Sequence, residues 1–295
     1  MLDLRDSKEY SLASLKSTKQ LLDLNPEYNT VWNFRRDIIS NIAEQELDTQ
    51  FWNDELMFTM EQLKRFPKVY WIWNHRLWLL QNYPIAGAEI WKKELAIVNK
   101  MLQLDGRNYH GWHYRRIIVG HIEKMTGEPM DEEEFQYVTR KINEDISNYS
   151  AWHQRALLLM RLASREDIDT GAKTELIRNE VNYITNAMFT DADDQSVWFY
   201  IKWFLRNGDI MEFFSRDDYV KMLDDLVENI RMINNDELEF SGKDNNWCLK
   251  ALNIIEGIQL KLGLHIERHS KEYLAKLEGE DPYRKEMYEY LASKL

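Results

Sequence analysis

The stretch DGRNYHGWHYRR, residues 105–116, is the clearest copy of a motif that recurs along most of the chain. The motif places a tryptophan after a short polar turn, and in most copies an arginine follows three residues later. Its copies centre on five tryptophans and on a degenerate sixth: Trp32, Trp73, Trp112, Trp152, Trp198 and Trp247. Consecutive tryptophans are 41, 39, 40, 46 and 49 residues apart. Self-similarity at a period of this size predicts a solenoid of repeated units.

Each repeat contains two helical patterns separated by a break. The first helix, as in residues 91–104, carries a glutamate followed by an apolar residue, and the second helix carries the tryptophan. The same 18-residue spacing separates four glutamates from their tryptophans: Glu55, Glu94, Glu134 and Glu180. The connections between repeats vary in length, so insertions are expected there. The sequence therefore predicts an all-α fold, a right-handed superhelical array of antiparallel helix hairpins that forms a single domain over residues 1–295.

The turn inside each hairpin has its own chemistry. Asn108, Asn148 and Asp194 lie four residues before their tryptophans, where their side chains can accept hydrogen bonds from the first free amides of the second helix. Pro67 and Gly106 stand in the turn itself, where a helix must stop. We therefore expect a capped turn of constant geometry.

Composition excludes several classes of protein. Hydrophobic residues make up 44 % of the 295 residues and charged residues 30 %, which fits a soluble, folded chain. The formal net charge of −12 argues against a protein that coats nucleic acid. A single cysteine, Cys248, allows no internal disulfide and no multi-cysteine zinc site. No run of about 18 apolar residues occurs, so we expect no membrane insertion and take the cytoplasm as the default compartment.

The recurring tryptophans and arginines are expected to be structural. One large aromatic side chain per repeat would fill the space between successive hairpins. The arginine lies on the same helical face, where it can stack on the indole or reach a glutamate of a first helix. The alternative is a positive strip, extended by Arg36 and Arg116, that meets an anionic ligand or an acidic partner. In the fifth copy Ile201 stands in place of the arginine. The predicted structural ladder, formed by the tryptophan and arginine of successive repeats, comprises Trp32, Arg35, Trp73, Arg76, Trp112, Arg115, Trp152, Arg155 and Trp198.

A few residues at the beginnings of the tryptophan helices are candidates for ligand binding. Lys68, Tyr70 and Tyr109 suit a phosphate there, because helix N-termini carry positive partial charge, although spacing alone favours a turn lysine and capping aromatics. His110 and His113 could share a metal ion, but no third ligand lies on a matching face, so His110 is better explained as a hydrogen-bond donor to a ligand. No nucleophile–base pair, phosphate-binding glycine loop or paired-carboxylate motif stands out. The chain does not look like a self-sufficient enzyme.

The segments PKVYWIWNHR, DGRNYHGWHYRR and SNYSAWHQR closely resemble the protein prenyltransferase α-subunit repeat. The resemblance runs from about residue 25 to residue 236 and covers five repeats. Within that family, DDQSVWFYIKWFL and YWIWNHRLWLL are similar to the Rab geranylgeranyltransferase (type II) α subunits. The compact fungal type is expected, without the immunoglobulin-like and leucine-rich-repeat domains of animal homologues.

The resemblance implies a function for an obligate heterodimer that is inactive as this chain alone. The enzyme would transfer geranylgeranyl from geranylgeranyl diphosphate to C-terminal cysteines of Rab GTPases bound to the Rab escort protein. The β subunit would hold the catalytic zinc, and this chain would bind no metal. The resemblance implies that Lys68, which would contact the diphosphate, and Tyr109 are catalytic, and that Tyr70, Asn108 and His110 bind the diphosphate and substrate. Val69 stands where farnesyltransferase relatives have asparagine, so no role is carried over to it.

Two alternatives stay open on the sequence. The chain could be the α subunit shared by farnesyltransferase and geranylgeranyltransferase I, which act on C-a-a-X tails. It could also be a non-catalytic helical-repeat scaffold of the tetratricopeptide type. The period near 40 residues rather than 34, and the fixed spacing of tryptophan and arginine, count against the scaffold.

Overall fold

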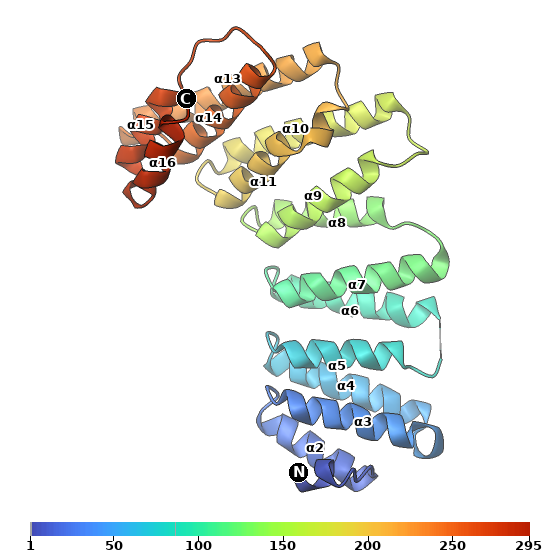
Figure 1. Cartoon of the computed structure of the whole chain (residues 1–295). Helices are drawn as coiled ribbons and strands as arrows, with labels where there is room; N and C mark the ends of the chain where they lie inside the picture. The colour runs from blue at the N-terminus through green and yellow to red at the C-terminus, as the bar shows by residue number, and fades with distance from the viewer. Residues whose placement is uncertain (1, 86) are drawn as a thin grey trace. The chain divides into compact units, whose positions relative to one another are not determined.

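The computed structural model describes residues 2–85 and 87–295, and within that part all regular secondary structure is helical (Figure 1). The all-α prediction is therefore confirmed. The chain forms two compact units, unit 1 from Met1 to Met130 and unit 2 from Asp131 to Leu295. The prediction that one superhelical domain spans the whole chain stays a prediction.

Unit 1 consists of three successive helix hairpins that follow the short helix α1 (Leu2–Asp6) (Figure 1). In each hairpin the second helix is the one that carries the tryptophan. The pairs are α2 (Leu12–Leu24) with α3 (Asn29–Glu46), α4 (Thr49–Arg65) with α5 (Tyr70–Gln81), and α6 (Ala88–Leu104) with α7 (Tyr109–Thr126).

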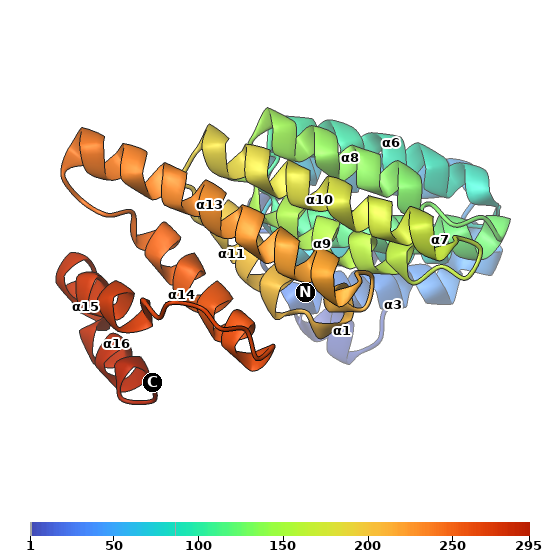
Figure 2. The ribbon, with the colours of Figure 1, turned by 90° about the horizontal axis from the view of Figure 1, so that it is seen from above.

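Unit 2 continues the pattern and ends in a short helical segment. Its pairs are α8 (Asp131–Glu144) with α9 (Tyr149–Ala163), α10 (Thr170–Thr190) with α11 (Gln195–Arg206), and α13 (Arg216–Ser241) with α14 (Asn246–Lys261). The remaining elements are α12 (Gly208–Met211), α15 (Ser270–Glu280), η1 (Pro282–Arg284) and α16 (Lys285–Ala292). Figure 2 shows α10 and α13 side by side on one side of the unit and α11 and α14 on the other.

The tryptophan side chains hold the turns of their own hairpins. In all five repeats the indole Nε1–H donates a hydrogen bond of 2.7–2.9 Å to the backbone carbonyl six residues earlier. The accepting carbonyls belong to Pro26, Pro67, Gly106, Ile146 and Ala192. The five indoles are at most 4 % exposed, so the prediction that they form the core is confirmed. Because the bond fixes the tryptophan against its turn, this part of the repeat cannot change in length.

The predicted helix caps are present. The Asn108 side-chain oxygen accepts hydrogen bonds from the His110 and Gly111 amides at 3.0 and 3.3 Å. Asn148 accepts one from the Ala151 amide at 3.1 Å, and Asp194 accepts one from the Ser196 amide at 2.7 Å. Each side chain satisfies backbone donors that a helix N-terminus leaves unpaired.

The sixth hairpin keeps the cap but not the tryptophan anchor. Asn245 caps α14 by accepting hydrogen bonds from the Trp247 and Cys248 amides at 2.9 and 3.1 Å. Trp247 lies two residues after this cap and is only partly buried, whereas the other tryptophans of the repeat follow the turn residue by four. Leu249 takes that fourth position and is 1 % exposed. The tryptophan of the degenerate copy is thus out of register with the others.

The arginines form buried ion pairs with the first helix of the following hairpin. Arg35 binds Glu55 with two hydrogen bonds of 2.6 and 2.5 Å. The same bidentate geometry joins Arg76 to Glu94 at 2.6 and 2.7 Å and Arg155 to Glu180 at 2.7 Å twice. All six side chains are nearly inaccessible to solvent. The ion-pair ladder is therefore confirmed for Arg35, Arg76 and Arg155, and the alternative of a surface strip is wrong for these three arginines.

Each of these glutamate carboxylates also contacts a second hydrogen-bonding residue, which lies on the next tryptophan helix. His75 Nε2 lies 2.9 Å from Glu55, the Tyr114 hydroxyl donates to Glu94 at 2.9 Å, and the Tyr200 hydroxyl donates to Glu180 at 2.7 Å. The rings of these three residues also pack against the tryptophan of the preceding repeat, with centroids 4.8–5.0 Å apart. Each glutamate thus connects two consecutive tryptophan helices.

The ionisation of the Glu55 site follows from these contacts. Burial acts to raise the pKa of Glu55, but Arg35 and the His75 hydrogen bond outweigh it and lower the pKa to about 2. Burial lowers the pKa of His75 below its usual value, although Glu55 opposes this shift. At neutral pH, therefore, the ionised Glu55 carboxylate is bound directly by the Arg35 guanidinium and also contacts a neutral His75 imidazole.

We predict that Glu94→Gln lowers the free energy of unfolding by about 3–5 kcal/mol, because it leaves the buried Arg76 charge without a counter-ion. Urea denaturation of the purified chain measures this. Lys92→Ala is the control, since Lys92 forms an exposed ion pair with Glu89 on the same helix and should cost under about 1 kcal/mol. Equal losses in the two variants would contradict a structural role for the ladder.

We predict that His75→Tyr reduces the loss of stability in mild acid. The folded-state pKa of His75 lies below its unfolded value, so the unfolded chain takes up a proton first as the pH falls below about 6.5 and stability declines. A tyrosine would supply the same hydrogen bond as Tyr114 and Tyr200 without titrating in this range. Thermal unfolding of both proteins between neutral pH and mild acid provides the measurement.

The exposed His153 provides the control for this test, since His153→Tyr should leave the acid dependence unchanged. If the His75→Tyr variant lost stability in acid as steeply as the unsubstituted chain, His75 would not be the group responsible.

Candidate functional site

The turns of the second and third hairpins bring the predicted ligand-binding residues together in unit 1. Lys68 lies in the turn between α4 and α5, and Tyr70 is the first residue of α5. Asn108 caps α7, and Tyr109 and His110 open that helix. The His110 ring centroid is 5.9 Å from that of Tyr70 and 4.0 Å from that of Tyr109. Both turns lie at the same edge of the unit (Figure 1).

Lys68 is the exposed cation of this cluster. Its side chain is 70 % exposed, and its ammonium lies 3.7 Å from the Asp105 carboxylate. An exposed ion pair of this length contributes little to stability, so its rearrangement costs little. Lys68 can therefore turn towards an anion placed at the beginning of α5 or α7.

His110 is the unusual group in the cluster, because it is buried yet incompletely hydrogen-bonded. The side chain is 7 % exposed, and its Nε2 atom has no partner among the residues that the structure describes. Burial lowers the pKa of His110, opposed by a hydrogen bond to the Lys68 backbone and assisted by His113. A buried polar atom without a partner is costly and calls for an explanation. A ligand at this turn would supply the missing contact, and an anionic ligand would favour the protonated, donating imidazole.

Asn108 has an architectural role that the sequence did not reveal. Besides capping α7, its side-chain N–H donates a 3.1 Å hydrogen bond to the Pro67 carbonyl, which also accepts from the Trp73 indole at 2.9 Å. Both polar atoms of this buried side chain are thus engaged inside unit 1. The contact fixes the peptide that immediately precedes Lys68, so Asn108 is a positioning residue for the cluster.

Gly111 is a second residue whose role only the packing reveals. A Cβ atom at this position would lie 2.9 Å from a methyl group of Leu102 on α6. The missing side chain therefore allows α7 to approach α6 closely where His110 leaves the turn. The sequence offered one signal, a glycine inside a helix next to a predicted cap.

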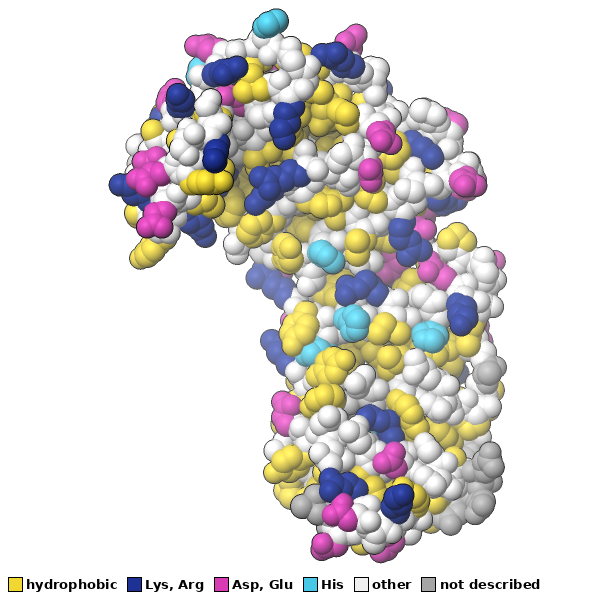
Figure 3. Space-filling view, in the orientation of Figure 1, with side chains coloured by type: hydrophobic (Ala, Val, Ile, Leu, Met, Phe, Trp, Pro, Cys, Tyr) yellow, Lys and Arg dark blue, Asp and Glu magenta, His cyan; other side chains and the backbone are white. Residues whose placement is uncertain are grey.

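The other histidines of the tryptophan helices lie outside this cluster or at its margin. His75 belongs to the buried ladder, and its 2.9 Å contact with Glu55 excludes it from a surface site. His113 is exposed, and its Nδ1 lies 3.5 Å from the Arg116 guanidinium. Burial lowers the pKa of the half-buried Arg36 and Arg116. Figure 3 shows histidine and hydrophobic side chains gathered on one face around α7.

Two further properties bear on the chemistry of the site. Across residues 2–85 and 87–295, no group of three or more His, Cys, Asp or Glu side chains is placed to hold a metal ion. In the same residues, no helix is both long and apolar enough to cross a membrane. The arrangement in unit 1 is a cationic and aromatic surface suited to an anion, without a nucleophile of its own.

We predict that Asn108→Ala lowers the free energy of unfolding by about 1–3 kcal/mol, since it removes a helix cap and the bond to the Pro67 carbonyl. Asn108→Ser keeps an oxygen that can cap the helix and loses only the bond to the Pro67 carbonyl, so its cost should be smaller. Asp169→Ala removes an exposed cap of α10 without a second bond and serves as the control. Equal stabilities of the alanine and serine variants, measured by urea denaturation, would refute the cap's contribution.

Comparisons with known proteins match the repeats described above. A family model described as the protein prenyltransferase alpha subunit repeat matches residues 12–42, 52–83, 91–122, 131–162 and 177–208. These segments coincide with the first five hairpins. The geranylgeranyl transferase type-2 subunit alpha of Saccharomyces cerevisiae is 54 % identical over 291 residues, which cover 99 % of this chain and 88 % of the relative. Its Candida albicans namesake is 33 % identical over 323 residues, covering 98 % of this chain and 87 % of the relative.

A solved structure supports the fold. It is the Candida albicans protein geranylgeranyltransferase-I complexed with GGPP, and one of its chains aligns with a TM-score of 0.69. The alignment covers 99 % of this chain and 87 % of that chain, at 24 % identity. Such a likeness shows that the helical-repeat architecture is shared.

Proposed function

The chain belongs to the type-2 geranylgeranyl transferase α-subunit family, which carries the protein prenyltransferase α-subunit repeat, and we propose that it acts as such a subunit in a heterodimer. The enzyme would transfer geranylgeranyl from geranylgeranyl diphosphate to C-terminal cysteines of Rab GTPases. The observation that carries this proposal is the similarity over almost the whole chain to a subunit of that name. The similarity to the relatives named above argues against the two alternative interpretations, a farnesyltransferase α subunit and a non-catalytic scaffold.

We assign the catalytic zinc to the β subunit. Cys248 is the one cysteine of this chain, and burial raises the pKa of its thiol to about 12. The described residues also place no group of three or more His, Cys, Asp or Glu side chains where it could hold a metal ion, which supports this assignment. Zinc bound in the β subunit would supply the Rab cysteine as a thiolate that displaces diphosphate from C1 of the prenyl chain.

The contribution of this chain is to bind and stabilise the diphosphate. The exposed ammonium of Lys68 would offset the negative charge that develops on the departing group. Tyr70 and Tyr109 are the first residues of α5 and α7, and their hydroxyl groups would donate hydrogen bonds to phosphate oxygens or to the substrate. His110 would supply its unpartnered Nε2, and Asn108 would hold the turn that carries Lys68.

Two partners beyond the β subunit belong to the proposal. The type-2 class implies that the Rab protein is presented by the Rab escort protein, and that the chain alone is inactive. Geranylgeranyl transfer to a full-length Rab by the chain co-purified with its β subunit, with and without escort protein, tests these points. Transfer to a short C-a-a-X peptide without escort protein would instead assign the chain to the type I class.

We predict that Lys68→Ala in the heterodimer lowers turnover roughly 30- to 1000-fold, equivalent to about 2–4 kcal/mol of transition-state stabilisation. Assembly with the β subunit should be unchanged, because Lys68 is exposed and weakly paired. Lys64→Ala is the matched control, since it removes the same charge from an exposed position on α4. Unchanged turnover, or an equal loss in both variants, would remove Lys68 from the site.

A further inference from the structure

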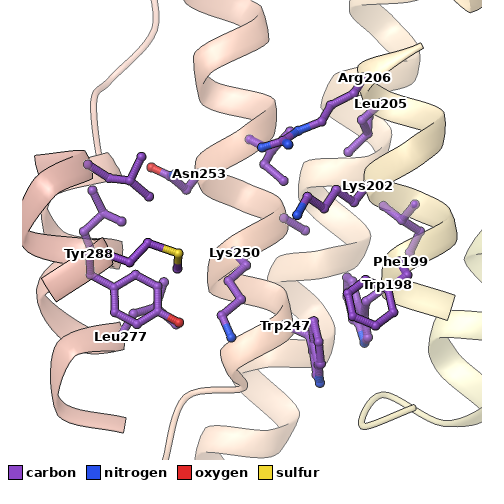
Figure 4. Close-up of a pocket in the computed structure, with 16 residues that line it drawn as sticks. Trp198, Phe199, Lys202, Leu205, Arg206, Trp247, Lys250, Asn253, Leu277 and Tyr288 are labelled. Carbon is purple, nitrogen blue, oxygen red and sulfur yellow. The ribbon is translucent and has the colours of Figure 1, made fainter. Parts of the chain in front are cut away.

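An apolar pocket opens in unit 2 between α11, α14 and the C-terminal helices α15 and α16 (Figure 4). Its volume is about 170 Å³, and its walls include Phe199, Trp247, Leu277 and Met287. A cavity of roughly 150 Å³ is sufficient to hold benzene. The pocket therefore matches one phenylalanine- or leucine-sized side chain, whereas a geranylgeranyl chain has far more carbon atoms than it can hold.

Three cationic side chains surround this apolar space. Lys202 and Arg206 lie one turn apart on α11 and reach towards α14, and Lys250 lies on α14 (Figure 4). Lys250 is partly neutralised, since its ammonium is 3.1 Å from the Asp281 carboxylate and 4.8 Å from the Trp247 ring centroid. Lys202 and Arg206 are exposed and form no ion pair with any residue that the structure describes.

The charge of this site is opposite to that of the chain. In a protein with a net charge of −12, carboxylates outnumber cationic side chains, yet Lys202 and Arg206 have no carboxylate within ion-pair distance among the described residues. Complementary charge favours the encounter and orientation of an acidic partner. The pocket also presents Phe199, which is 41 % exposed and packs edge-on against Trp247 with centroids 5.6 Å apart. Exposed aromatic surface beside charged groups is typical of energetically important contacts between proteins.

The wall formed by the C-terminal helices is held in place by a polar network. The Asp281 carboxylate accepts hydrogen bonds from the Tyr288 hydroxyl at 2.6 Å and from Arg284 at 2.8 Å, in addition to its contact with Lys250. Tyr288 is the buried residue of α16, so these bonds attach α16 to α14. A preformed pocket lowers the entropic cost of binding.

We propose that this pocket docks an acidic segment of a partner protein. The segment would insert one phenylalanine- or leucine-sized side chain between Phe199 and the C-terminal helices, while flanking carboxylates pair with Lys202 and Arg206. The site lies in unit 2 and uses none of the residues assigned to the diphosphate. A failure of this proposal would therefore leave the proposed function intact.

Fluorescence anisotropy of labelled synthetic peptides with the purified full chain tests this proposal. The probes are an acidic heptapeptide with a central phenylalanine (DEDFDED), the same peptide with alanine at the centre, and a basic peptide with phenylalanine (KRKFKRK). We expect the acidic phenylalanine peptide to bind in a salt-dependent manner and each of the other two to bind about tenfold or more weakly.

Charge reversal gives the sharper comparison. Lys202→Glu together with Arg206→Glu should abolish binding of the acidic peptide and create binding of the basic one. Lys261→Glu together with Lys271→Glu makes the same change of net charge at exposed positions outside the pocket and should leave the preference unchanged. Phe199→Ala should weaken binding of the acidic peptide about fivefold or more, since it removes one wall of the pocket. Circular dichroism verifies that every variant is folded.

Three results would overturn the proposal. The first is no binding of the acidic phenylalanine peptide, and the second is an equal effect of the two charge-reversed pairs. The third is binding to vesicles containing phosphatidylserine that depends on Lys202 and Arg206, without binding of the peptide. That third result would assign the cations to an anionic membrane surface instead.

Discussion

The buried carboxylate that accepts hydrogen bonds from two consecutive tryptophan helices is the interaction on which the repeats depend. Glu94, for example, is bound by Arg76 of α5 and by Tyr114 of α7. The same arginine also donates to Thr59 of α4 at 3.0 Å, so this one cluster connects all four helices of two successive hairpins. Removing one member of such an ion pair strongly destabilises the fold, because the other member stays buried and charged. Stacking of hairpins by apolar contacts alone would not fix which residues face each other.

The candidate site is a consequence of this fixed register. Each tryptophan bonds to the carbonyl of its own turn, and each ladder residue fixes one hairpin against the next, so the turns are repeated at the same edge of unit 1. The hydrogen bond from Asn108 to the Pro67 carbonyl joins two of these turns directly. Residues 42 positions apart, such as Lys68 and His110, therefore meet through their turns rather than through any local motif. Hydrogen bonds hold the backbone of these turns, whereas the Lys68 side chain is exposed and forms one long ion pair.

Periodicity identified the recurring residues but not the neighbours that they contact. The five hairpins, the caps at Asn108, Asn148 and Asp194, the buried tryptophans and the ion-pair ladder were all predictable, because each is repeated at a constant spacing. The second donors His75, Tyr114 and Tyr200 were not, because the residue type changes from one repeat to the next. The displaced register at Trp247 and the bond from Asn108 also escaped prediction, since both depend on packing between distant segments.

The distribution of cations gives a criterion for function in this acidic chain. Arg35, Arg76 and Arg155 are fully occupied by buried carboxylates, so mutating them would report on folding rather than on ligand binding. Lys68 is loosely paired, and Lys202 and Arg206 are unpaired within the described part of the chain. A cation retained at the surface without a strong partner, beside aromatic groups, gains most from an incoming anion. The same criterion selects both the turn of unit 1 and the pocket of unit 2. The apolar cavity beside Lys202 and Arg206 suits a side chain flanked by carboxylates.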